Sequence, residues 1–170
     1  MEQAELYEAI GGSRDAAGAE VAPLSKLPDG HGVGRRRGER DQDAVGVDPE
    51  PVLRAKCRPV TEVTPEIRTL AADMLETMRE ANGVGLAAPQ IAVDLQLAVI
   101  DVSHNPDCIT FMKVNGEKVD MVQHMPVVLM NPQLDLGSAK EIGEEGCLSF
   151  PRLRGDIRRS SQIKVTYTDL

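Results

Sequence analysis

Aromatic residues are scarce in this chain of 170 residues, which has no Trp, two Phe and two Tyr. A core built around aromatic rings is therefore excluded, and the interior must come from aliphatic side chains and Met. No apolar run approaches the ~18 residues that would predict a membrane-spanning helix. The opening MEQAELYEAIGGSRD carries acids where a signal peptide needs basic residues, and it has no apolar stretch. We therefore expect no membrane partner.

The chain also lacks an excess of basic residues and closely spaced pairs of cysteines. The net charge is -8 and the pI is about 4.9, which argues against a protein that binds nucleic acid directly. The three cysteines, Cys57, Cys108 and Cys147, are odd in number and widely spaced, and no CxxC is present. A disulfide framework is not expected, and a reducing compartment, the cytoplasm, fits better.

The composition changes near residue 48. Residues 1–48 are rich in Gly, charge and small side chains, and show no sustained periodicity. This segment is predicted to be disordered, or to be an extension produced by a start codon assigned too far upstream. The cluster Arg35-Arg36-Arg37 is followed by acids, so a solvated tail of mixed charge is favoured over a nucleic-acid contact. The ordered domain is expected over residues 49–170.

One helix followed by several strands is predicted within that domain. Thr64 suits an N-cap and Pro65 the first helical position, while Asn82-Gly83 suits the end. A single apolar stripe runs between them, formed by Ile67, Leu70, Ala71, Met74, Leu75 and Met78. Strand-like runs follow over residues 95–102, 125–134 and 161–170, with a hairpin tip at Asn115-Gly116. The predicted fold class is α+β, with this helix packed on antiparallel sheet.

Two short segments are difficult to explain as scaffold alone. In NGVGLAAPQ (82–90), small residues would let another backbone or an extended ligand come close, and Gln90 presents one amide. In EEGCLSFP (144–151), Cys147 could be a packed thiol, a nucleophile or a metal ligand. Neither segment decides the question by itself.

Together, the order and spacing of GVGLAAPQ, the strand VVLMNP and EGCLS resemble the peptide deformylase family. The resemblance extends from about Asp48 to Leu170 and includes DPEPVLR at its start. It implies a metal-dependent hydrolase, using Fe²⁺ or Zn²⁺, that removes the formyl group from the N-terminal formyl-methionine of nascent proteins. Its partners would be N-formylmethionyl peptides at the ribosome.

The resemblance also implies roles for individual residues. Cys147 corresponds to a metal ligand, and the Gln90 amide and the Leu148 backbone N–H correspond to donors to the developing formyl oxyanion. Substrate binding corresponds to residues of both segments and of the chain just after them: Gly83, Val84, Gly85, Glu145 and Arg154.

The family's third motif, HExxH, is absent. The chain contains only His31, His104 and His124, and none of them begins that pattern. Two His spaced by four share one helix face and would complete the ligand set, with the intervening Glu as acid and base. We therefore expect a C-terminally truncated member, lacking the family's C-terminal metal-binding helix, poorly stable and inactive by itself.

Two other functions remain open. The donors of Gln90 and Leu148 could still hold an N-terminal peptide without turnover, as a peptide-binding remnant. A thiol or redox protein using Cys147 is the third hypothesis, although no resolving cysteine or nearby general base accompanies it.

Overall fold

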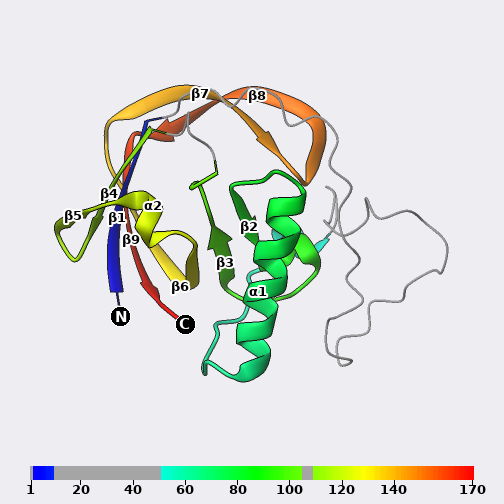
Figure 1. The fold of residues 1–170 in the computed structure, drawn as a ribbon. Coiled ribbons are helices and arrows are strands. Elements are labelled where there is room, and N and C mark those ends of the chain that lie inside the picture. The colour runs from blue at the N-terminus through cyan, green and yellow to red at the C-terminus, as the bar shows by residue number, and fades with distance from the viewer. Residues whose placement is uncertain (1, 10–50, 105–108) are drawn as a thin grey trace.

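The computed structural model describes residues 2–9, 51–104 and 109–170, and it combines one long helix with antiparallel sheet (Figure 1). A sheet of seven strands has the order β2-β3-β6-β9-β1-β4-β5, and a second sheet pairs β7 with β8. All strand pairs are antiparallel. The elements are β1 Glu2–Ala9, η2 Pro51–Arg54, α1 Pro65–Glu80, β2 Gly85–Ala87, η3 Ala88–Ile91, β3 Leu97–Ile100, β4 Ile109–Val114, β5 Glu117–Val119, α2 Met121–His124, β6 Val127–Leu136, β7 Lys140–Cys147, β8 Phe150–Ser160 and β9 Gln162–Thr168. The predicted α+β class is confirmed.

Helix α1 begins and ends where its sequence predicts. The Thr64 side chain accepts a hydrogen bond from the Ile67 N–H at 3.4 Å, so it satisfies one of the unpaired amides of the first turn. After the last turn, Asn82 has a φ of 51°, and the Gly83 N–H donates to the Met78 carbonyl at 2.8 Å. This left-handed exit turns the chain directly into β2.

Two hydrophobic clusters lie on opposite faces of the large sheet. Successive side chains of a strand point to opposite faces, and in β3 Val99 belongs to the first cluster while Ile100 packs against the second. The first cluster joins the buried stripe of α1 to residues of β2, η3, β3 and β6. The second cluster consists of Met112, Val127, Leu129, Val165 and Tyr167. The core is therefore aliphatic and Met-rich, apart from Tyr167.

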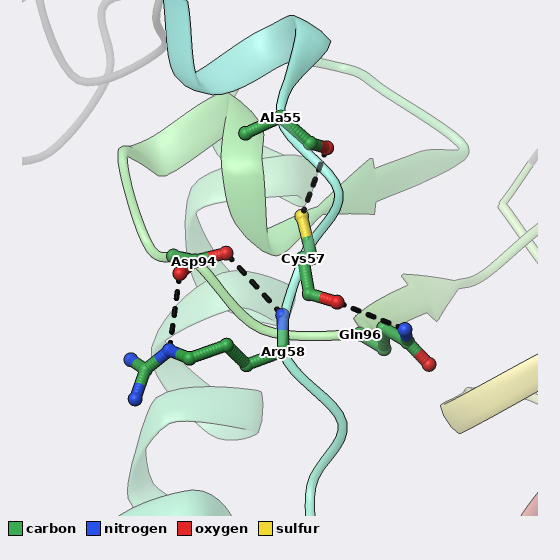
Figure 2. A network of polar contacts seen from close by, with 5 residues as sticks. All are labelled: Ala55, Cys57, Arg58, Asp94 and Gln96. Carbon is green, nitrogen blue, oxygen red and sulfur yellow. Dashed lines mark hydrogen bonds and ion pairs between the residues drawn. The ribbon is translucent and has the colours of Figure 1, made fainter.

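The segment before α1 is held against the sheet by polar contacts (Figure 2). Arg58 forms an ion pair with Asp94 at 3.0 Å, and the Gln96 amide donates to the Cys57 carbonyl at 2.9 Å. Further along, the Asn131 side chain both accepts from the Val60 N–H and donates to the Val60 carbonyl, each at 2.8 Å. One amide thus replaces a strand partner for Val60, which fixes the segment before α1 on β6.

The β7–β8 hairpin arches over one end of the large sheet and brings its tip towards the C-terminal end of α1 (Figure 1). Residues 140–160 show no clear alternation of polar and apolar residues, and this long hairpin was not predicted. Several large apolar side chains are exposed on β6, β7 and β8, namely Leu134, Leu136, Ile142 and Leu153. No helix in the described part of the chain is long and apolar enough to cross a membrane.

The N-terminal segment contains one described strand. Residues 2–9 form β1, which pairs with both β9 and β4, instead of lacking regular structure. The alternation in EQAELYEA was too short to distinguish from the low-complexity sequence after it. The rest of the predicted disordered segment, residues 10–48, lies outside the described residues.

Candidate functional site

Gln90 lies in η3, directly after the edge strand β2, and its side-chain amide has a defined orientation. The Gln90 Oε1 atom accepts a hydrogen bond from the Ala87 N–H at 2.9 Å. Because the oxygen is engaged in its own turn, the Nε2 group points the other way, towards the tip of the β7–β8 hairpin. There Nε2 donates to the Ser149 hydroxyl at 3.2 Å and lies 4.0 Å from the Cys147 sulfur.

Cys147 is the last residue of β7, where the pairing with β8 changes register between Gly146 and Cys147. Such an irregularity redirects a side chain relative to the regular ladder. The Cys147 thiol is free and exposed, whereas Ser149, two residues later, is 3% exposed. Leu148, between them, lies in the turn that joins β7 to β8.

Gly83 explains how the two sequence segments meet. A Cβ atom at Gly83 would lie 3.4 Å from the Leu148 Cδ1 atom and 3.3 Å from the Met78 carbonyl oxygen. A larger residue at Gly83 would therefore crowd both the end of α1 and the Leu148 side chain. The structure brings Gly83, Gln90, Cys147 and Leu148 to one place, although 57 residues separate Gln90 from Cys147.

Val84 and Gly85 lie at the edge of the large sheet. In the described part of the chain β2 pairs only with β3, so its outer side carries no strand. Val84 is exposed, and its carbonyl accepts from the Asp101 N–H at 3.0 Å. A Cβ at Gly85 would meet only the Val99 carbonyl, at 3.7 Å. This edge has the geometry that an extended peptide needs for strand addition.

Glu145 and Arg154 each form an ion pair within the hairpin, with different partners. Arg159 binds both carboxylate oxygens of Glu145 at 2.8 Å. This hydrogen bonding lowers the pKa of Glu145 more than its partial burial raises it, and the Arg159 charge lowers it further. Arg154 lies opposite Gly146 in the ladder and reaches Glu144 at 3.5 Å. Their assignment to substrate binding stays a prediction.

The donor set does not fit a metal ion. Among residues 51–104 and 109–170, no three His, Cys, Asp or Glu side chains come together in a group that could hold one. Cys147 contributes a single soft ligand, while the His124 ring bonds its own helix through the Asp120 carbonyl at 3.0 Å. His104 is exposed after β3, and His31 lies outside the described residues. A tetrahedral zinc or iron site needs more ligands than these residues provide.

Cys57 provides a contrast with Cys147. Burial, and then the nearby Asp94 carboxylate, raise the pKa of the Cys57 thiol. Its sulfur contacts the Ala55 carbonyl at 3.8 Å (Figure 2). A protonated, structurally engaged thiol is a poor nucleophile and a poor ligand, so the chemistry of interest lies at Cys147.

Comparison with known proteins identifies the family of this chain. Residues 43–170 match the family model described as polypeptide deformylase. The chain belongs to this family. A peptide deformylase from Methylacidiphilum infernorum is 46% identical over 120 residues, which cover 71% of this chain and 63% of that protein. The chain therefore spans less than two thirds of the length of that curated relative.

Solved structures of the family agree in fold. The crystal structure of peptide deformylase from Thermotoga maritima superposes with a TM-score of 0.59 at 34% identity, covering 74% of this chain and 72% of that one. A peptide deformylase from Synechococcus elongatus, solved in complex with actinonin, gives a TM-score of 0.61 at 32% identity and covers 74% of this chain and 60% of that one.

Sequence reasoning missed two residues of the site. It gave no role to Ser149, whose buried hydroxyl receives the Gln90 amide. It also missed Arg159, the partner of Glu145. Ser149 could have been suspected, because a hydroxyl two residues after the cysteine needs a partner if the turn is buried. Nothing in the sequence pointed to Arg159, because its pairing depends on the hairpin register.

Proposed function

We propose that this chain takes part in the family reaction, the hydrolysis of the N-formyl group from N-terminal formyl-methionine of nascent proteins in the cytoplasm. The observation that supports this best is the position of Gln90. Its amide donor lies beside Cys147 and the Leu148 turn, and its own oxygen is held by Ala87. A donor fixed in this way can bind a developing oxyanion without reorganisation.

Each part of the site has a role in this proposal. The Gln90 Nε2 and the Leu148 N–H donate to the formyl oxygen. The outer side of β2, with Gly83, Val84 and Gly85, pairs with the extended peptide and places the formyl group at the hairpin tip. Glu145 and Arg154 keep the hairpin in register beside the peptide. Cys147 would supply one ligand to the divalent metal, Fe²⁺ or Zn²⁺, that the family reaction requires.

We further propose that this chain alone does not catalyse the reaction, because the described residues supply one metal ligand. Addition of Fe²⁺ under anaerobic conditions, or of Zn²⁺, to the purified 170-residue chain should release no formate from formyl-Met-Ala-Ser above the protein-free rate. A coupled formate assay measures this. Metal-dependent turnover that is abolished by Cys147→Ser would show that the chain forms a working site.

The second candidate function is peptide binding without turnover, which is supported by the proximity of Gln90 to the hairpin tip and by the lack of a metal-ligand group among the described residues. The chain should then bind formyl-Met-Ala-Ser more tightly than unformylated Met-Ala-Ser in an NMR titration. Gln90→Glu keeps the oxygen that accepts from Ala87 but removes the N–H donor. It should weaken binding of the formyl peptide about fivefold, the value of one uncharged hydrogen bond.

The matched control for Gln90 is Gln133→Glu, because Gln133 is an exposed amide on β6. This substitution makes the same change of charge and should leave both titrations unaltered. Equal affinity for the formylated and unformylated peptides would contradict a role for Gln90 in binding the formyl group. So would an equal loss of affinity in Gln90→Glu and Gln133→Glu.

A further inference from the structure

The strand β1 comes from outside the part of the chain that matches the family, yet it lies inside the sheet. The family match begins at residue 43, whereas β1 is Glu2–Ala9. In the sheet order β1 lies between β9 and β4, and among the described strands β4 and β5 are linked to the rest of the sheet only through it. Figure 1 shows β1, in blue, beside β9 and β4. An added segment thus completes the ladder between two strands of the family domain.

The register of β1 matches both neighbours in polarity. Position 5, an acid, is opposite Lys113 of β4 and also opposite Lys164 of β9. Apolar positions also face apolar positions on each side: Leu6 is opposite Met112 and Ile163, and Ala4 is opposite Val114 and Val165. Opposite charges and apolar pairs at directly opposed positions stabilise sheets, and like charges destabilise them. A single register of β1 therefore places residues of matching polarity opposite each other on both β4 and β9.

The two strands that flank β1, namely β4 and β9, both contribute residues to the second hydrophobic cluster. Met112 of β4 packs in the second cluster with Val165 and Tyr167 of β9, and with Leu129 of β6. Met121 and Met125, on and after α2, pack against the same cluster. Side-chain packing on one face of the sheet therefore links β4 to β9, in addition to the backbone ladder through β1.

From these observations we infer that the space between β9 and β4 is a strand-acceptor site, and that Glu2–Ala9 is its separable occupant. The site takes an extended strand whose register places an acid opposite Lys113 and Lys164, and apolar residues on either side of that acid. Main-chain hydrogen bonds on both sides supply affinity, as in other strand-addition complexes, and the alternate side chains supply specificity. The inference does not depend on the proposed deformylase chemistry.

The first test reverses charge in the full chain. Glu5→Lys places three lysines across neighbouring strands and should raise amide hydrogen exchange in β4 and β9 about tenfold. Adding Lys113→Glu and Lys164→Glu should restore slow exchange. Glu8→Lys is the control, because Glu8 is opposite Thr110 in β4. Exchange in α1 should not change in any variant. Equal effects of Glu5→Lys and Glu8→Lys, or no restoration by the swap, would overturn the assigned register.

The second test asks whether the occupant is separable. Proline at position 6 removes a ladder donor and prevents the chain's own strand from pairing. A fluorescent peptide of residues 1–10 should bind the full chain that carries Leu6→Pro with one-to-one stoichiometry, measured by anisotropy. The peptide with Glu5→Lys should bind about tenfold more weakly, and should recover when the acceptor carries Lys113→Glu and Lys164→Glu. Loss of the α1 helical signal in Leu6→Pro, or no peptide binding, would show that β1 is an integral strand and overturn the inference.

Discussion

Replacement of Arg79 by alanine is expected to lower the free energy of unfolding by about 1.5–3 kcal/mol, the range for hydrogen bonds to a charged group. Arg79, near the end of α1, donates to one oxygen of Asp101 from Nε at 3.0 Å and from a terminal nitrogen at 2.6 Å. The Asp101 side chain is 3% exposed, whereas that of Arg79 is 49% exposed. The cost falls below that of a fully buried pair because water can partly replace the guanidinium.

The same pair predicts a pH dependence. Burial alone would raise the pKa of the Asp101 carboxyl, but hydrogen bonds from Ser103 and Arg79 outweigh it, and the pKa lies below its ordinary value. A lowered folded-state pKa stabilises the fold above the unfolded pKa of about 3.9. That stability is lost as the pH falls through the folded-state pKa. The difference in melting temperature between the wild type and Arg79→Ala should therefore be full at pH 7 and shrink below about pH 4.

A surface pair provides the control for Arg79. Glu144 and Arg154 lie 3.5 Å apart and their side chains are 54% and 38% exposed. Glu144→Gln should change stability by less than about 1 kcal/mol, since exposed pairs contribute little. Urea denaturation of the three proteins measures both differences. If Arg79→Ala costs no more than Glu144→Gln, Asp101 does not depend on Arg79 for its place in the fold.

The elements that follow from local chemistry were predictable. Thr64, Pro65 and the apolar stripe after them define α1, whose N-cap hydrogen bond is present. Asn115 and Gly116 both have positive φ, as a two-residue hairpin between β4 and β5 requires. The β7–β8 hairpin and β1 were not predicted. Their stability depends on pairing with strands distant in sequence, and no single segment records that pairing.

In the candidate site, too, the residue types were predictable from the sequence, whereas their orientations and partners were not. Gln90 and Cys147 were selected as residues of interest, and the structure brings them together. The amide orientation was not predictable, because the hydrogen bond from the Ala87 N–H depends on the η3 turn. The role of Gly83 in the fold also required the structure, since its neighbour Leu148 lies far along the chain. Residue types can thus suggest chemistry, but orientation and partners come from tertiary contacts.

Met74→Ala should destabilise the chain by about 2–5 kcal/mol, the range for truncating a large buried side chain. Met74 is fully buried in the middle of α1. Its cluster also contains Leu86, Ala88 and Ile91, from the segment that carries Gln90, and Leu148 packs against it. A cavity at Met74 therefore lies beneath both halves of the candidate site. We expect the side-chain amide resonances of Gln90 to shift in this variant, in addition to the loss of stability seen in urea.

Leu129→Ala is the matched comparison, because Leu129 belongs to the second cluster on the opposite face of the same sheet. Its truncation should cost a similar free energy, about 2–5 kcal/mol. It should nevertheless leave the Gln90 resonances in place, since no residue of η3 or of the hairpin tip belongs to that cluster. Equal shifts in the two variants would mean that the site responds to global stability. A shift confined to Met74→Ala would show that the cluster beneath α1 positions the Gln90 donor beside Cys147.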